Sequence, residues 1–176
     1  MAELITFDQA HRLLTYDPDE GLFTWRESRG GEAAGSKAGG AFIHTRAGTG
    51  GSAVDVWLYL IGINYRLYRG HRLAWFMTYG EWPPLVDHRD GDPLNNRLDN
   101  LRPATRRMNS QNMRRAMPKN STGLLGAGVD IERGGFKSEI KLPNGTRKFL
   151  GRFETAIQAH EAYIEAKRLL HEGCTI

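Results

Sequence analysis

The stretch Leu85-Val-Asp-His-Arg-Asp-Gly-Asp-Pro-Leu-Asn-Asn-Arg-Leu-Asp-Asn-Leu-Arg102 carries the densest group of polar side chains in the protein. Apolar residues stand near both of its ends, a pattern typical of two short strands that flank a polar loop. Thr105 follows and can cap a helix that runs to about Asn112. The sequence therefore predicts strand, loop, strand and helix, in that order.

This arrangement would bring together a carboxylate, an imidazole and two amides, from Asp87, His88, Asn100 and Asn109. Hydrolysis of a phosphodiester needs a base that deprotonates water and a divalent cation that stabilises charge on the leaving oxygen. His88 can serve as the base. Asp87 and the amide oxygen of Asn109 are hard ligands suited to Mg²⁺ or Mn²⁺. The four residues together indicate a candidate site for phosphodiester hydrolysis.

Other interpretations of the same residues remain open. Asp87 and His88 could belong to a turn, with the asparagines satisfying backbone groups. The spacing of acidic residues in the loop does not match an EF-hand, and no second His or Cys stands at zinc-ligand spacing. Glycine-rich segments occur without a phosphate-binding motif, which argues against nucleotide hydrolysis.

Composition and charge narrow the class of protein. Of the 176 residues, 40% are hydrophobic and 25% charged, as in soluble globular proteins. The longest apolar run is too short to span a bilayer, and the N-terminal residues lack a leader pattern, so we expect no membrane association and a cytoplasmic location. The single cysteine, Cys174, excludes an internal disulfide or a Cys-rich zinc site.

The net charge is only +4, but the basic residues are unevenly distributed. Residues 101–129 contain no acid and six basic side chains: Arg102, Arg106, Arg107, Arg114, Arg115 and Lys119. Such a stretch is typical of contact with a polyphosphate, although a solvated linker would have the same composition.

The remaining segments predict short elements on either side of the polar loop. Before it we expect helices over 7–14 and 71–79, strands over 22–25, 53–61 and 65–68, and a loop or irregular hairpin over 30–51. After it we expect antiparallel strands over 127–132, 136–142 and 146–151, and a final helix that begins after Thr155 and turns Ala156, Ala159, Tyr163, Ala166 and Leu170 to one face.

Several motifs resemble phage and bacterial HNH endonucleases of the His-Asn-Asn kind. They are Tyr16–Trp25, His71–Trp75, Gly80–Pro84, Val86–Gly91, Asn96–Arg102 and Ala104–Asn109. The resemblance implies a ββα-metal motif that cleaves DNA. His88 would be the general base, Asp87 and Asn109 the metal ligands, and Asn100 the residue that braces the loop and orients the histidine. Many relatives have His where Asn109 stands. The resemblance suggests structural roles for Asn96-Arg97, and we interpret His71 as a buried or helix-capping residue.

Residues 124–173 resemble an AP2/ERF DNA-binding domain, in which a three-stranded sheet enters the major groove and a helix supports it. The matching segments are Gly128-Val129, Phe136, Glu139–Lys141, Leu150–Phe153 and Thr155–Tyr163. Asp130 and Phe136 replace the Arg and Trp usual in that family. Candidate DNA-facing residues are Arg133, Lys137, Lys141, Arg147 and Lys148, which could equally be ordinary solvated side chains.

We therefore expect an α+β protein with an HNH module over 1–117, a basic linker over 118–123 and an AP2-like module over 124–176. The expected function is a metal-dependent endonuclease, nicking or double-strand, acting on double-stranded DNA with one Mg²⁺ or Mn²⁺ and leaving 5′-phosphate and 3′-hydroxyl ends. Its expected setting is a bacterial cell, encoded by a phage or mobile element. The alternative is a regulatory DNA-binding protein without catalysis.

Overall fold

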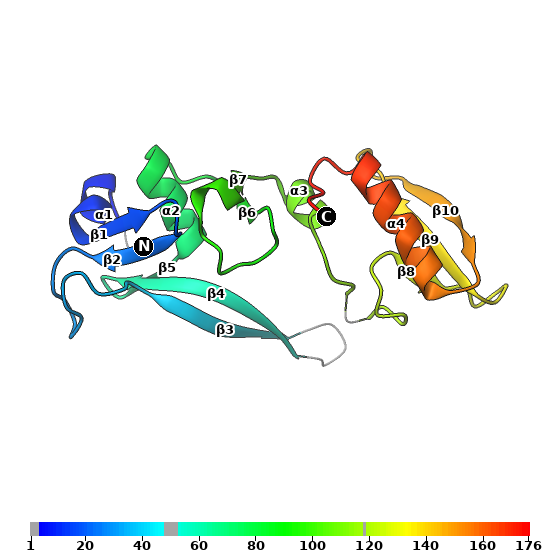
Figure 1. Ribbon diagram of the computed structural model, residues 1–176, viewed down its shortest axis with the longest axis horizontal. Helices are drawn as coiled ribbons and strands as arrows, with labels where there is room; N and C mark the ends of the chain where they lie inside the picture. The colour runs from blue at the N-terminus through cyan, green and yellow to red at the C-terminus, as the bar shows by residue number, and fades with distance from the viewer. Residues whose placement is uncertain (1–3, 48–52, 118) are drawn as a thin grey trace. The chain divides into compact units, whose positions relative to one another are not determined.

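The computed structural model describes residues 4–47, 53–117 and 119–176 (Figure 1). The chain forms two compact units. The first comprises Met1–Arg46 and Val54–Ala104, and the second is built around Thr105–Ile176. The division precedes the expected linker at 118–123, so the helix that follows the polar loop belongs to the second unit.

The first unit begins with a helix and a hairpin. Thr6 caps α1 (Phe7–Leu13) and exchanges hydrogen bonds with Gln9, as the sequence predicts. β1 (Leu14–Asp17) pairs antiparallel with β2 (Leu22–Trp25). β1 was not predicted as a strand. The Asp17 carboxylate accepts hydrogen bonds from the backbone N–H groups of Asp19 and Glu20, which closes the turn between the two strands.

A three-stranded sheet in the order β3-β4-β5 follows. Its strands are β3 (Gly40–Ala47), β4 (Ala53–Ile63) and β5 (Arg66–Arg69). β4 and β5 confirm the predicted hairpin, and its turn places Asn64 and Tyr65 at positive φ. β3 lies in the glycine-rich segment predicted as a loop or irregular hairpin. Pairing with β4 stabilises an extended conformation that its local sequence does not favour.

α2 (Gly70–Tyr79) ends at Gly80, whose φ of 77° is the left-handed conformation expected of a helix stop. The predicted inner face of this helix is confirmed, because Leu73, Phe76 and Met77 are buried in the core of the first unit. β6 (Val86–His88) then pairs antiparallel with β7 (Leu101–Pro103), and the 3₁₀ helix η1 (Leu98–Asn100) leads into β7.

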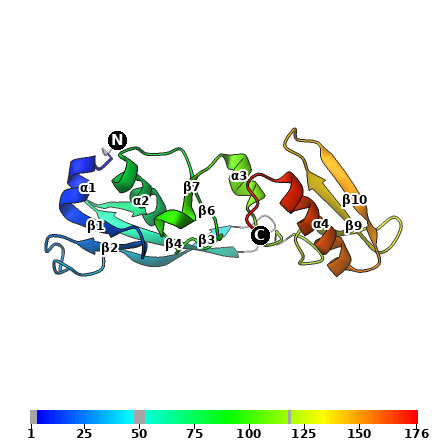
Figure 2. The same cartoon turned by 45° about the horizontal axis from the view of Figure 1, so that its top comes forward.

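The second unit contains α3 (Arg106–Gln111), β8 (Ala127–Val129), β9 (Phe136–Lys141), β10 (Arg147–Phe153) and α4 (Ala156–Leu170). The three strands form an antiparallel sheet in the order β10-β9-β8, and α4 lies alongside it (Figure 2). A three-stranded sheet with one helix is the predicted architecture of this region. Ala159 of α4 and Ile140 of β9 are fully buried in its core.

α4 differs from the prediction in one buried residue. Lys167, which the apolar pattern did not include, is 1% exposed and donates a hydrogen bond to the Met113 carbonyl. Burial lowers the pKa of this lysine. The contact is part of a cluster that holds the α3 region, in which the Gln111 side chain accepts from the Gly173 N–H. α3 is therefore supported by α4 and the C-terminal segment.

A close backbone approach in the second unit depends on glycine. Gly126 has φ +77°, and a Cβ atom there would lie 1.9 Å from Tyr163 Cγ on α4. Gly123 has a similar φ of +69° but open space around the Cβ position. We expect Gly126→Ala to lower the free energy of unfolding by about 2–4 kcal/mol and Gly123→Ala by about 1–2 kcal/mol. Denaturant titration of both variants measures the difference, and equal losses would show that Tyr163 does not pack on Gly126.

Candidate active site

Asp87 is held by a buried ion pair. The antiparallel register places it opposite Arg102, so both side chains project from the same face of the β6–β7 pair. The Asp87 Oδ2 atom accepts from Arg102 Nε at 3.2 Å and Nη2 at 2.9 Å. Asp87 is 6% exposed and Arg102 8%. Arg102 thus departs from the expectation of a DNA-facing arginine, because its charge is buried against a carboxylate.

His88 is also buried, and its imidazole faces a side chain of the loop. Its Nε2 atom lies 3.4 Å from Asn96 Oδ1, while Asn96 Nδ2 donates to the Leu94 carbonyl at 3.2 Å. The second bond assigns the orientation of the amide, so that its oxygen faces the imidazole. Since an amide oxygen only accepts, the neutral imidazole carries its proton on Nε2 and its lone pair on Nδ1.

A second histidine lies against the first. The rings of His71, near the start of α2, and His88 are 4.9 Å apart between centroids and nearly perpendicular. Burial lowers the pKa of His71 to about 3, and repulsion from His88 when that ring is protonated and from the charges of Arg69 and Arg72 adds to the effect. Burial likewise lowers the pKa of His88. Both imidazoles are therefore neutral at neutral pH, the form in which a histidine accepts a proton.

Asn100 braces the polar loop. Its Nδ2 donates to Asp90 Oδ1 at 2.9 Å and to the Asn95 carbonyl at 2.8 Å, and its Oδ1 accepts from the Asp90 N–H at 3.0 Å. Burial opposes ionisation of Asp90, but hydrogen bonds from the Asp92 backbone, Asn95 and Asn100 lower its pKa. The hydrogen bond to the imidazole is made by Asn96, which the sequence analysis regarded as structural.

The β1–β2 hairpin supports this loop from the other side. The Tyr16 hydroxyl donates to the Asn96 carbonyl at 2.7 Å, and the Leu98 N–H donates to the Pro18 carbonyl at 2.9 Å. Gly21, with φ +69°, lets the hairpin turn approach: a Cβ there would lie 2.5 Å from the Arg97 nitrogen. These contacts connect the Tyr16–Trp25 motif to the polar loop, which sequence spacing alone did not indicate.

Asn109 lies exposed on α3 in the second unit, whereas Asp87, His88 and Asn100 lie in the first. Five basic residues from the acid-free stretch are exposed in the second unit: Arg106, Arg107, Arg114, Arg115 and Lys119. Arg114 donates to the Thr175 carbonyl and hydroxyl, both at 2.9 Å. It is therefore engaged with the C-terminal segment.

The basic residues on the sheet of the second unit lie on two different faces, one toward α4 and one away from it. Ser138 and Ile140 are buried on the α4 side, so Lys137 and Lys141 project from the opposite face. Arg147 pairs with Lys141 and shares that face, whereas Lys148 stands opposite Ile140 on the α4 side. Arg133 is exposed in the turn before β9.

Two further residues on the open face were missed by the sequence analysis. Arg152 pairs with Lys137, and Phe149 is half-exposed with the Arg152 guanidinium 5.2 Å from its ring centroid. Arg152 Nε also donates to the Asp130 carboxylate at 2.7 Å. They escaped prediction because β10 runs two residues beyond its predicted end and contains a bulge after Phe149, which shifts the alternation of side chains.

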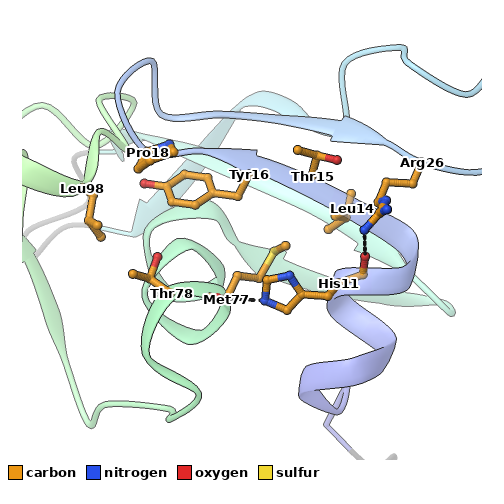
Figure 3. A pocket seen from close by; sticks show the side chains of 9 residues that line it. All are labelled: His11, Leu14, Thr15, Tyr16, Pro18, Arg26, Met77, Thr78 and Leu98. Atoms are coloured by element: carbon orange, nitrogen blue, oxygen red, sulfur yellow. Dashed lines mark hydrogen bonds between the residues drawn. The ribbon is translucent and has the colours of Figure 1, made fainter.

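A cavity of about 240 Å³ lies in the first unit (Figure 3). Its lining comes mainly from α1, β1 and α2, and includes His11, Tyr16 and Met77. His11 Nε2 donates to the Met77 carbonyl at 2.8 Å, and Arg26 donates to the His11 carbonyl at the same distance. Asp87, His88 and Asn100 do not line this cavity, whereas Tyr16 and Leu98 do.

The Asp87 carboxylate and the Asn109 amide each supply oxygen donors, the kind that Mg²⁺ and Mn²⁺ prefer, and such ions retain several water ligands. Within the described residues, no group of three or more His, Cys, Asp or Glu side chains is gathered as a metal site. None of the described helices has the length and apolar character needed to cross a membrane.

Comparison with known proteins identifies the polar loop and its flanking elements. The HNH endonuclease family model matches residues 68–111, which include α2, β6, β7 and α3. The match ends before β8, β9 and β10 of the second unit, and the AP2/ERF resemblance of that region receives no support. Protein 3.8 of Escherichia phage T7 is 36% identical over 91 residues, covering 50% of this chain and 74% of the phage protein. No solved structure matches significantly. The chain therefore belongs to the family of phage T7 Protein 3.8 and contains an HNH endonuclease domain at residues 68–111.

Proposed function

We propose that the protein is a metal-dependent DNA endonuclease, nicking or double-strand, in which His88 is the general base. The observation that carries this proposal is the buried His88 imidazole at the start of the polar loop of an HNH domain, neutral and hydrogen-bonded to Asn96. A neutral imidazole is suited to remove a proton from water, and His88 directly follows Asp87, a candidate metal ligand, in β6.

In the proposed reaction, His88 accepts a proton from a water molecule while the water oxygen forms a bond to phosphorus. The bond between phosphorus and the 3′ oxygen breaks, and that oxygen takes a proton from solvent. The products are a 5′-phosphate and a 3′-hydroxyl end. Asn100 keeps the loop that follows His88 in one conformation through its bonds to Asp90 and Asn95.

Asp87 and Asn109 are the proposed ligands for one Mg²⁺ or Mn²⁺. The assignment of Asp87 is supported by its place beside His88, and that of Asn109 rests on the motif spacing. When bound, the cation supplies positive charge that stabilises the leaving oxygen. Arg102 holds Asp87 through Oδ2, so the carboxylate keeps a defined orientation.

We further propose that the open sheet face of the second unit contacts double-stranded DNA. Lys137, Lys141 and Arg147 project from one face, and Arg152 adds a fourth basic side chain there. Basic side chains on one surface attract the phosphate backbone regardless of base sequence. The exposed arginines at 106, 107 and 115 extend the basic character of this unit.

We expect His88→Ala to reduce plasmid nicking about 10²–10⁴-fold, because loss of a general base removes its contribution to the transition state. Nicking is measured with purified protein and Mg²⁺, beside a His44→Ala control that removes an exposed imidazole on β3. Binding to uncut DNA should remain near that of the wild type. If His88→Ala nicks within a few-fold of wild type, another group is the base; if the wild type itself binds DNA without nicking, the protein is a binding protein.

Asp87→Asn and Asn109→Ala should each raise the concentration of Mn²⁺ needed for half-maximal nicking, since the first removes the negative charge of one proposed ligand and the second removes the other ligand altogether. Asp87→Ala would leave the buried Arg102 with neither the charge nor the acceptor oxygen of Asp87, at a cost of about 3–5 kcal/mol, whereas Asn keeps an oxygen that can accept from the guanidinium, so the Asn variant is the informative one. The control is Asp99→Asn, an exposed acid in the same domain. Unchanged metal midpoints for both ligand variants would remove these residues from the site.

Neutralising Lys137, Lys141 and Arg147 together by substitution with Gln should reduce the slope of log K against log salt by about 3, roughly 0.9 for each phosphate contact. Lys148→Gln, on the opposite face, should leave the slope unchanged. Substitution is preferable to removing the second unit, because that unit supports α3. Binding to duplex DNA over a salt series tests this, and an unchanged slope in the triple variant would show that this face does not contact DNA.

A further inference from the structure

We propose that Asn96 is a positioning residue for His88, and that the β1–β2 hairpin at the N-terminus holds Asn96 in place for this task. Asn96 accepts the Nε2 proton of His88 and thereby leaves the proton-accepting lone pair on Nδ1. The role in catalysis rests on the proposed function. The hydrogen bond itself does not, and it can be tested without DNA.

The hydrogen bonds of Asn96 leave its side chain one orientation. The residue is 1% exposed. Its Nδ2 donates to the Leu94 carbonyl, its Oδ1 faces His88 Nε2, and its own carbonyl accepts from the Tyr16 hydroxyl. Turning the amide over would set its oxygen against the Leu94 carbonyl, which costs the Nδ2–Leu94 hydrogen bond at a buried position.

Two glycines bring the supporting elements close to Asn96. A Cβ on Gly70, at the start of α2, would lie 3.1 Å from Asn96 Nδ2 and 2.9 Å from the Tyr59 ring. A Cβ on Gly21, in the β1–β2 turn, would lie 2.6 Å from the Asn96 carbonyl carbon. Asn96 is therefore enclosed by α2 and by a hairpin about 75–80 residues earlier in the chain.

Tyr16, in the β1–β2 hairpin, is suited to support Asn96 through a lasting hydrogen bond to its carbonyl. Burial, together with nearby carboxylates, raises the pKa of its hydroxyl, so that it remains a donor at any pH the protein experiences. Its ring also stacks on Phe23 with centroids 4.8 Å apart, which holds the hydroxyl in position. The Tyr16–Trp25 motif thus contributes to the site through Asn96, without touching His88 itself.

Asn96 and Asn100 are separable by their contacts. Asn100 bonds Asp90 and Asn95 and sets the path of the loop, whereas Asn96 is bonded to the imidazole. Loss of the first should disturb the whole loop. Loss of the second should affect proton transfer most, with little effect on DNA binding or on metal affinity.

The first test observes the Nε2 proton of His88 by NMR in ¹⁵N-histidine-labelled protein, without metal or DNA, with His88→Ala to assign the signal. In the wild type and in Asn95→Ala this proton should be visible and slow to exchange, because Asn95 binds Asp90 through its side chain and not the imidazole. In Asn96→Leu it should be lost. A protected Nε2 proton in folded Asn96→Leu would overturn the proposal.

The second test is steady-state nicking. Asn96→Leu should lower kcat about 10–100-fold, as loss of a supporting hydrogen bond to a site residue typically does, with KM for DNA and the Mn²⁺ midpoint within about two-fold of wild type. If KM for DNA and the Mn²⁺ midpoint instead rise in parallel with the fall in kcat, Asn96 is a general packing residue, and its positioning role is overturned.

Tyr16→Phe keeps the stacked ring and removes only the bond to the Asn96 carbonyl, so it tests the hairpin even if Asn96→Leu does not fold. It should speed exchange of the His88 Nε2 proton and lower kcat a few-fold. If the exchange rate of the His88 Nε2 proton and kcat in Tyr16→Phe equal those of the wild type, the hairpin does not contribute to holding Asn96. Failure of the wild type to nick DNA would remove the proposed function, while the NMR result would still decide whether Asn96 holds the imidazole.

Discussion

The ion pair between Asp87 and Arg102 is the interaction on which the candidate site depends. Both groups are removed from water, and each is tolerable there because the other lies directly across the β6–β7 pair. The ion pair therefore forms only in the observed register of these two very short strands, and the position of Asp87 in the site depends on that register. A shift by one residue would place Asp87 and His88 on exchanged faces and leave a buried arginine without its carboxylate.

The polar loop between these strands is also ordered by buried polar groups, each of which needs a hydrogen-bond partner. Asn100 forms hydrogen bonds with Asp90 at the beginning of the loop. Further along the loop, the Asn96 side chain bonds to the Leu94 carbonyl and to His88. The hairpin of the first unit completes the set through Tyr16. A loop of this composition has few apolar side chains to bury, so its conformation depends on hydrogen bonds and on the elements packed around it.

The second unit shows how α3 can belong to the HNH sequence motif and yet be held by a different part of the chain. Lys167, Gln111 and Gly173 join the α3 region to α4 and the C-terminal segment. The apolar pattern of α4 gave no indication of this, since a lysine is rarely buried. Its burial is tolerated because its ammonium group donates to a carbonyl and its long apolar stem packs in the core.

Local patterns in the sequence were sufficient for most elements: the Thr6–Gln9 cap, the Gly80 stop, the 53–69 hairpin, the strand-loop-strand-helix order and the three strands with α4. The HNH domain could also be identified, from motifs that resemble the family, whereas the roles of Asp87, His88, Asn100 and Asn109 stay predictions. β1 and β3 could not, because each is extended through pairing with a partner strand. The burial of Arg102, the bond from Asn96 to His88 and the support from Tyr16 were decided only by the tertiary structure. Each joins residues whose contact depends on strand register or on distant segments packing together, and a one-dimensional pattern carries no record of which buried polar groups satisfy one another.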